Sequence, residues 1–241
     1  AALLAAGADL TVAVSRVMPH DPEILLLLAA YGIPVIGAER TEGPYDVVLD
    51  CAGALSHVPS LCGYVELTRS GAQHYVGCTQ PVWMVDAGKI KQIETCLGTG
   101  ESFFRALASL GFDDWHGKTL VVIGYGKVGR GIVLHALNNR MRVIVADIEE
   151  KRLPSPSVSF LRATDGAALS HAVKQAFCAV TATGRRHALS NLIDPALPCS
   201  SGVLLANMGV EDEWGPSIPK NRILNEGRPL NFILPDPTQM C

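Results

Sequence analysis

The sequence predicts an α/β protein built on a Rossmann-type, doubly wound parallel sheet, with a second, smaller α/β domain. Short apolar strands alternate with helical stretches along the first part of the chain, which is the pattern of β-α-β units. Later, the wholly apolar segment 120–123 runs directly into a glycine-rich turn and a helical stretch. A central parallel strand that is covered on both faces has this character.

The length of 241 residues allows two domains that each bury a core. We expect a substrate-type α/β domain over residues 1–110, completed by residues 232–241, and a cofactor domain over residues 111–231. Between them, the segment 91–110 has the apolar spacing of a long helix, which predicts a bridge between the domains.

The smaller domain begins with short strands and one helix. Strands are predicted at residues 10–14, 33–37 and 46–50. The helix is predicted from about Pro22 to Tyr31, because Asp21 can cap its first turn and Gly32 ends it. Asp50 ends the third strand, and acids at strand ends of a parallel sheet face the crevice where ligands bind.

Charge and hydropathy argue against two classes of partner. The net charge is −3 and no segment concentrates Lys and Arg, so nucleic acid is not an expected partner. The longest apolar run, Ile24–Ala30, is far shorter than the roughly 20 residues that span a bilayer, so no membrane association is expected.

The seven cysteines are scattered without a Cys-x-x-Cys pair, which predicts neither a metal site nor a disulfide framework. The sequence does not start with Met, and its first residues lack the pattern of a signal peptide. We therefore expect that the natural chain begins earlier and that the protein is cytoplasmic, in a reducing compartment.

The turn after residue 123 has the spacing of a dinucleotide-binding fingerprint. Its members are Gly124, Tyr125, Gly126, Lys127, Val128 and Gly129. The first glycine allows the turn, the second lets a pyrophosphate approach the backbone, and the third lets the helix pack on the strand. Asp147 ends the next predicted strand, where a carboxylate binds the ribose hydroxyls of adenosine and repels a 2′-phosphate. The pattern predicts an NAD site rather than an NADP site.

Further strands are predicted at residues 142–146, 176–181 and 203–206.

This loop resembles the GYGxVGxG loop of S-adenosylhomocysteine hydrolases, and other segments match that family in the same order. Residues 97–102 resemble its YGCRES segment, 180–184 its TTTG strand end, 206–209 its CNIGH turn and 225–231 its AEGRLVNL segment. Residues 32–35, 49–53 and 66–71 resemble its GIPVFA, LDDGGD and EETTTG stretches. The chain is identified as a divergent member of this superfamily.

The resemblance implies a tightly held NAD that transiently oxidises a ribose 3′-hydroxyl, so that a thiol is eliminated and water adds. Most of the family's acid and base positions are changed here. Glu94 and Thr95 stand at an Asp-Asn pair, Ile90 at a lysine, and Leu67, Cys51, Val210 and Asp236 at further acids and histidines. One positioned acid or base commonly contributes about 10²–10⁴-fold to a rate. The resemblance therefore predicts a kept cofactor site and a rebuilt substrate site.

The positions that face the cofactor in the family are better kept. They are Thr68, Ser70, Thr181, Thr183, Gly184, Asn207 and Asn231. The catalytic candidates are the ionisable residues beside positions that line the family's cleft, namely Asp50, Glu66, Lys89, Lys91 and Glu94. A partly desolvated lysine can act as a base and a carboxylate can polarise a hydroxyl, although each of these residues could equally be a solvated charge. Trp83 and Trp214 are open to two interpretations, as stacking or as packing residues.

The pattern favours an NAD-dependent enzyme related to S-adenosylhomocysteine hydrolase, which transfers a hydride at a carbinol of a nucleoside-like or other polar metabolite. The net reaction is either redox or a redox-neutral elimination, hydrolysis or epimerisation. Two alternatives stay open. One is an NAD-binding regulatory protein without turnover, and the other is a dehydrogenase of small 2-hydroxy acids, which would need a His and an Arg at the nicotinamide. A homo-oligomer, a dimer or larger, is expected from the resemblance.

Overall fold

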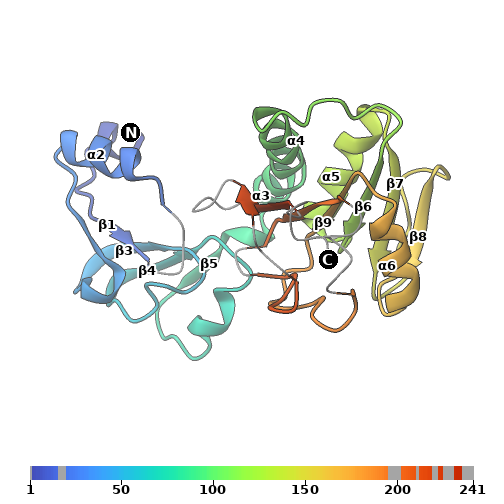
Figure 1. Cartoon of the computed structure of the whole chain (residues 1–241). Helices are drawn as coiled ribbons and strands as arrows, with labels where there is room; N and C mark the ends of the chain where they lie inside the picture. Colours follow the sequence, from blue (N-terminus) through green and yellow to red (C-terminus); the bar gives the residue numbers. More distant parts are fainter. Residues whose placement is uncertain are drawn as a thin grey trace. The chain divides into compact units, whose positions relative to one another are not determined.

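The computed structural model describes residues 2–15, 20–194, 202–209 and 212–218, and the strands at 222–224 and 231–234. The chain divides into two compact units, residues 1–92 and 93–241 (Figure 1). The two units meet between residues 92 and 93, whereas the sequence predicted a domain boundary at residue 110. The difference arises because the helix before residue 110 packs on the second unit.

The second unit contains a seven-stranded sheet in the order β11-β12-β10-β9-β6-β7-β8. Its strands are β6 (Thr119–Ile123), β7 (Arg142–Asp147), β8 (Val158–Arg162), β9 (Cys178–Thr181), β10 (Leu204–Asn207), β11 (Arg222–Leu224) and β12 (Asn231–Leu234). Strands β8, β7, β6, β9 and β10 are parallel, whereas β12 pairs antiparallel with β10 and β11. From β6 the chain adds β7 and β8 on one side and β9 and β10 on the other. This doubly wound order confirms the predicted Rossmann-type class.

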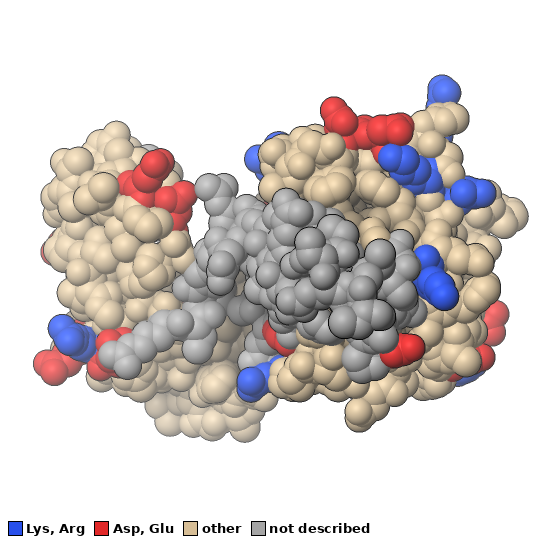
Figure 2. Space-filling model, in the orientation of Figure 1, with Lys and Arg blue, Asp and Glu red and all other residues tan. Residues whose placement is uncertain are grey.

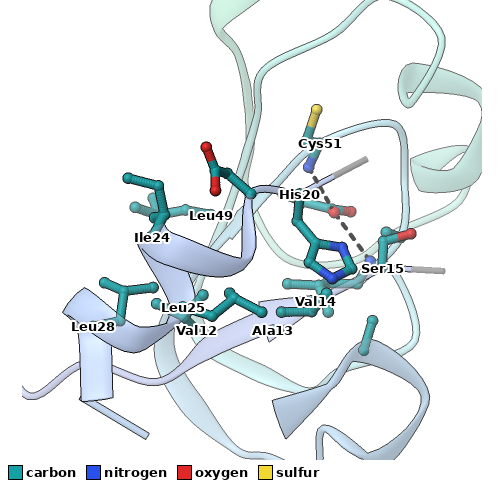
Figure 3. A pocket seen from close by; sticks show the side chains of 15 residues that line it. Val12, Ala13, Val14, Ser15, His20, Ile24, Leu25, Leu28, Leu49 and Cys51 are labelled. Atoms are coloured by element: carbon teal, nitrogen blue, oxygen red, sulfur yellow. Dashed lines mark hydrogen bonds between the residues drawn. The ribbon is translucent and has the colours of Figure 1, made fainter. Parts of the chain in front are cut away.

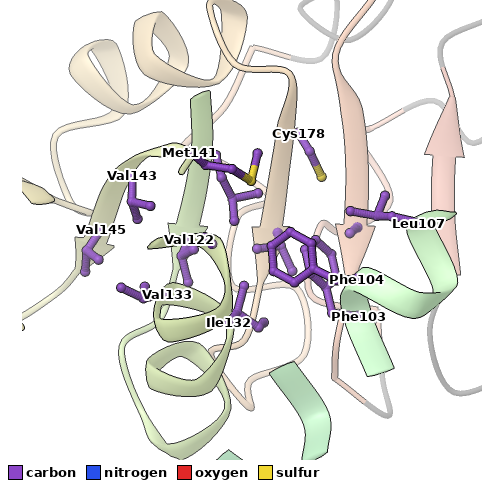
Figure 4. Close-up of a cluster of buried hydrophobic side chains, with 14 of the residues drawn as sticks. Phe103, Phe104, Leu107, Val122, Ile132, Val133, Met141, Val143, Val145 and Cys178 are labelled. Carbon is purple, nitrogen blue, oxygen red and sulfur yellow. The ribbon is translucent and has the colours of Figure 1, made fainter. Parts of the chain in front are cut away.

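Both faces of this sheet are covered, which explains why β6 is apolar throughout its buried part. The helices are α4 (Thr99–Ser109), α5 (Lys127–Asn138) and α6 (Gly166–Lys174). Val122 points to the face where α4 and α5 pack (Figure 4), and Leu120 belongs to the same core. Val121 and Ile123 point to the opposite face and join the core that contains α6. Alternating side chains of one strand thus fill two cores.

The helical segment before α4 differs from the single long helix predicted over residues 91–110. It consists of α3 (Lys89–Ile93), the π-helix η4 (Glu94–Gly98) and α4. The π-helix lies against α5, and a Cβ built on Gly131 would lie only 1.5 Å from the Cys96 carbonyl oxygen. Nε2 of His135 on α5 lies 3.1 Å from the Leu97 carbonyl oxygen. These contacts show that the π-helix packs closely on α5.

The first unit contains two small parallel sheets, β1-β2 and β3-β4-β5. Its strands are β1 (Val12–Val14), β2 (Val35–Gly37), β3 (Tyr45–Asp50), β4 (Ser60–Glu66) and β5 (Val82–Met84). Its helices are α1 (Ala2–Ala5) and α2 (Pro22–Ala30), with the 3-10 turns η1 (Ala38–Arg40), η2 (Ala72–Tyr75) and η3 (Val85–Ala87). The strands β1 to β3 and α2 lie where the sequence predicts them. The sequence did not predict β4, in which Ser60 and Gly63 interrupt the apolar pattern.

The surface of the first unit is rich in apolar side chains. Helix α2 buries none of its residues, and Leu26 is 72% exposed. In the view of Figure 2 this unit shows few charged side chains, and Lys and Arg on the second unit are scattered rather than gathered into one basic area. No helix in the described part of the chain is long and apolar enough to span a membrane.

Candidate dinucleotide site

The glycine-rich turn joins β6 to α5 at the point where the strand order of the sheet reverses. The Gly124 amide donates to the Ala146 carbonyl oxygen at 2.8 Å, and the Ala182 amide donates to the Ile123 carbonyl oxygen at 2.7 Å. The turn is therefore tied to the ends of both neighbouring strands. Gly124 has φ +96°, a conformation that strongly favours glycine, and a Cβ there would lie 2.5 Å from the Ala182 carbonyl oxygen. Ligands of doubly wound sheets bind at such a switch point.

The other two glycines of the turn differ in what surrounds them. A Cβ on Gly129 would lie 2.0 Å from the Gly124 carbonyl oxygen, so only glycine lets α5 begin this close to the turn. Around a Cβ on Gly126 there is no atom within 4 Å. Gly126 is the N-cap of α5, and no side chain caps the helix there. The positive end of α5 is thus open at Gly126, which suits a phosphate group.

Asp147 lies beside this turn, at the end of β7. Its Oδ2 accepts a hydrogen bond from the Tyr125 amide at 2.8 Å, and its Oδ1 accepts one from the Glu149 amide at 3.2 Å. The side chain is half-buried, and each carboxylate oxygen has a further lone pair. The carboxylate can therefore fix the turn and still accept hydrogen bonds from a ribose, as the sequence predicts.

The polar residues at the ends of β9 and β10 mainly bind one another. Thr181 is fully buried, and its hydroxyl donates to Asn207 Oδ1 at 3.3 Å. The Asn207 side-chain amide donates to the Gly209 carbonyl oxygen at 2.8 Å. Thr181 lies at the end of β9, where the resemblance places a residue beside the cofactor, but its hydroxyl is buried against Asn207. Asn231 pairs with Asn207 through the backbone ladder of β12 and β10.

Glu213 is a member of this site that the sequence did not predict. Its Oε2 accepts hydrogen bonds from the Thr183 amide at 2.8 Å and from the Thr183 hydroxyl at 2.9 Å. Its Oε1 accepts one from the Gly184 amide at 2.8 Å. Two of the predicted cofactor residues are thus held by a buried acid. Only the folded chain shows this, because residues 183 and 213 are brought together by β10.

The acidic candidates Asp50 and Glu66, which end β3 and β4, are buried and bind loops of the first unit. Asp50 Oδ1 accepts hydrogen bonds from the Cys51 and Leu55 amides at 2.7 and 3.0 Å, and its Oδ2 accepts one from the Tyr75 hydroxyl at 2.5 Å. Glu66 is fully buried, and its Oε1 accepts a hydrogen bond from the Thr68 hydroxyl at 2.6 Å. These carboxylates order the loops that follow β3 and β4.

Thr68 and Ser70 belong to the same network. The Ala52 amide donates to Thr68 Oγ1 at 3.0 Å and to Glu66 Oε1 at 3.1 Å, and the Gly53 amide donates to Glu66 Oε2 at 3.2 Å. The Ser70 hydroxyl donates to Thr68 Oγ1 at 3.2 Å. Asp50, Glu66, Thr68 and Ser70 are therefore brought together, but each of these contacts is made within the first unit.

Cys51, which stands where the related family has an acid, does not offer a thiolate. Burial raises the pKa of its thiol, and the negative charges of Glu66 and Asp50 raise it further, against a smaller lowering by Lys91. The thiolate is the nucleophilic form of cysteine, and a raised pKa disfavours it.

The remaining catalytic candidates lie on the segment from α3 to η4. Lys89 is exposed at the start of α3, and Lys91 is half-buried on the same helix. Glu94 is exposed in η4, and its Oε2 accepts a hydrogen bond from the Thr95 hydroxyl at 3.0 Å. Val210 and Asp236 lie outside the described residues. The catalytic roles expected for Lys89, Lys91 and Glu94 stay predictions.

Tyr75 gives a test of the network around Asp50. Burial and the hydrogen bond to Asp50 raise the pKa of its hydroxyl above the ordinary value of about 10, so the folded chain holds this proton more tightly than the unfolded chain. We expect Tyr75→Phe to lower the free energy of unfolding of the first unit by about 1–3 kcal/mol at neutral pH, because Asp50 loses a donor.

The stabilising effect of the Tyr75 hydroxyl should decrease progressively as the pH rises above about 10, because the unfolded tyrosine ionises there while the folded one keeps its proton to higher pH. Denaturant unfolding of the wild type and of Tyr75→Phe at a series of pH values measures this difference. A difference that is the same at neutral pH and above pH 10 would contradict the assigned hydrogen bond.

The first unit also contains a pocket of about 360 Å³ between β1, α2 and the end of β3 (Figure 3). Its walls are mainly apolar, with Val12 and Val14 from β1 and Leu25 and Leu28 from α2. His20 and Asp21, which are both exposed, are polar residues of its lining, and Figure 3 labels His20.

Comparison with known proteins gives relatives in sequence, although no protein-family model matches the chain. S-inosyl-L-homocysteine hydrolase of Methanothermobacter thermautotrophicus is 29% identical over 197 residues, which are 81% of this chain and 44% of that protein. Adenosylhomocysteinase of Thermotoga maritima is 31% identical over 183 residues, which are 68% of this chain and 43% of that protein. The chain thus spans less than half the length of these curated relatives.

Solved structures resemble the chain only at low similarity. D-lactate dehydrogenase from Escherichia coli has a TM-score of 0.44 at 14% identity, covering 85% of this chain and 76% of that one. NAD-dependent formate dehydrogenase from Staphylococcus aureus, solved in complex with NAD, has a TM-score of 0.43 at 11% identity, covering 88% and 76%. The chain is a divergent member of the superfamily that contains the adenosylhomocysteinases.

Proposed function

We propose that the second unit binds NAD and that the chain acts as an NAD-dependent enzyme related to adenosylhomocysteinase. The observation that carries this proposal is the open N-terminus of α5 at Gly126, which lies at the switch point of the sheet. The pyrophosphate would bind at this helix end. Asp147, at the end of the neighbouring strand, would accept hydrogen bonds from the adenosine ribose and disfavour a 2′-phosphate.

The substrate that we propose is a nucleoside-like metabolite with an oxidisable carbinol. Support comes from the names of the relatives, one of which hydrolyses S-inosyl-L-homocysteine. Bound NAD would supply a hydride acceptor for that carbinol. The net reaction is either a redox reaction or a redox-neutral elimination, hydrolysis or epimerisation that passes through the oxidised carbinol.

A second candidate is an NAD-binding regulatory protein that has lost turnover. Support comes from the first unit, where Asp50 and Glu66 are buried and accept hydrogen bonds from their own loops. Such carboxylates have a structural role and are not poised for proton transfer to a ligand.

Mixing the purified chain and NAD with candidate substrates distinguishes the proposed enzyme from the regulatory protein. We would test S-adenosylhomocysteine, S-inosylhomocysteine, their nucleosides and a set of 2-hydroxy acids, and follow NADH absorbance and free thiol together. Thiol release without net NADH identifies the redox-neutral reaction, and accumulation of NADH identifies a dehydrogenase. Bound NAD that stays oxidised with every compound would support the regulatory candidate and contradict the enzyme.

A further inference from the structure

The Glu213 carboxylate is buried at the ends of two central strands. It is 1% exposed, and three hydrogen bonds reach it, from the Thr183 amide, the Thr183 hydroxyl and the Gly184 amide. All three partners donate. An ionised carboxylate only accepts hydrogen bonds, so this surrounding suits the charged form of the side chain.

Hydrogen bonds to the end of β10 also fix the backbone around Glu213. Its backbone amide donates to Asn207 Oδ1 at 2.9 Å, at the end of β10. The next residue, Trp214, is fully buried, and its indole Nε1 donates to the Ala206 carbonyl oxygen at 3.0 Å. Trp214 is therefore a packing residue. These contacts fix residues 213 and 214 to the end of β10. They place the Glu213 carboxylate against residues 183 and 184, in the loop that follows β9.

The loop that Glu213 holds forms one wall of the glycine turn. A Cβ on Gly124 would lie 2.5 Å from the Ala182 carbonyl oxygen and 2.9 Å from the Thr183 nitrogen. Displacing Thr183 would therefore displace the surface against which Gly124 packs. The position of the turn depends on the position of this loop.

We propose that Glu213 is a positioning residue of the dinucleotide site and that its buried negative charge favours the oxidised nicotinamide over the reduced one. The inference rests on the proposed binding of NAD. The strands β9 and β10 lie on the opposite side of the switch point from β7, where Asp147 would take the adenosine ribose. In a complex with this orientation, the Glu213 carboxylate would lie toward the nicotinamide end, where NAD carries a positive charge that NADH lacks.

The size of the charge effect follows from electrostatics. In general, two opposite unit charges about 10 Å apart at an effective dielectric constant of about 20 attract strongly enough to change a binding constant by about tenfold. Glu213→Gln keeps the size of the side chain and removes the charge. We expect it to weaken binding of NAD more than binding of NADH, so that the ratio of the two dissociation constants shifts by about tenfold.

Thr183→Val is the matched variant, because it removes one hydrogen bond to Glu213 and leaves the charge in place. We expect it to weaken binding of both nucleotides several-fold with an unchanged ratio. Titration calorimetry of the 241-residue chain with NAD and with NADH gives all of these constants.

Each part of the inference can fail separately. Equal weakening of both nucleotides by Glu213→Gln would overturn the charge effect, and unaltered affinities of Thr183→Val would overturn the positioning role even if Glu213→Gln does not fold. A wild type that binds neither nucleotide would instead refute the proposed function, and the inference with it.

Discussion

Replacing Gly131 by alanine is expected to unfold the second unit or to destabilise it by about 3 kcal/mol or more, because the added methyl group has no space. The Cβ would lie 1.5 Å from the Cys96 carbonyl oxygen and 2.5 Å from its carbonyl carbon, both backbone atoms of the π-helix. A flexible side chain could move aside, but here the whole segment η4 would have to leave α5. Loss of cooperative thermal unfolding, or a midpoint far below that of the wild type, is the expected measurement.

Gly98→Ala is the matched control. Gly98 ends the same π-helix with helical backbone angles of −67° and −39°, and there is no atom within 4 Å of a Cβ there. Alanine costs less backbone entropy than glycine in a helix, so this variant should be as stable as the wild type or more stable by up to about 1 kcal/mol. Equal stability of Gly131→Ala and Gly98→Ala would contradict the close contact between η4 and α5.

Replacing Gly126 by alanine is expected to weaken NAD binding by about 10- to 100-fold without affecting the fold. Gly126 has φ −80°, which alanine adopts, and its Cβ would enter open space at the N-terminus of α5. In the proposed complex this is the space that the pyrophosphate fills, and overpacking of this kind costs about 1–3 kcal/mol. Titration calorimetry gives the affinity, and thermal unfolding shows whether the variant keeps the stability of the wild type.

The Gly126→Ala variant distinguishes an effect on NAD binding from an effect on the stability of the fold. A stable variant with unaltered NAD affinity would place the nucleotide somewhere other than this helix end. An unstable variant would contradict the open surroundings of Gly126.

Much of the second unit could be predicted from the sequence, because its main features depend on local patterns. Strand β6 is apolar on both faces, and the spacing of Gly124, Gly126 and Gly129 reflects a turn, an open helix end and a close helix contact. Strand β8 could not be predicted in the same way, since the proline-rich segment before it gives no periodic signal.

The polar contacts of the site could not be predicted, because they join residues that are far apart in the sequence. Nothing near Glu213 indicates that its carboxylate meets Thr183, which is brought to it by the pairing of β9 with β10. The contact of the Thr181 hydroxyl with Asn207 is another example, because it joins two strand ends that are 26 residues apart in the sequence. The resemblance placed Thr181 beside the cofactor and could not indicate that this hydroxyl is buried. A motif fixes which residue types occur, and the fold decides which of them face a ligand.

Binding of NAD and of NADP to the purified chain tests the central claim most directly. We predict that NAD binds at a single site and that NADP binds at least about tenfold more weakly, because Asp147 disfavours a 2′-phosphate. Absence of NAD binding to the folded chain, or preference for NADP, would contradict the roles assigned to the glycine turn and to Asp147.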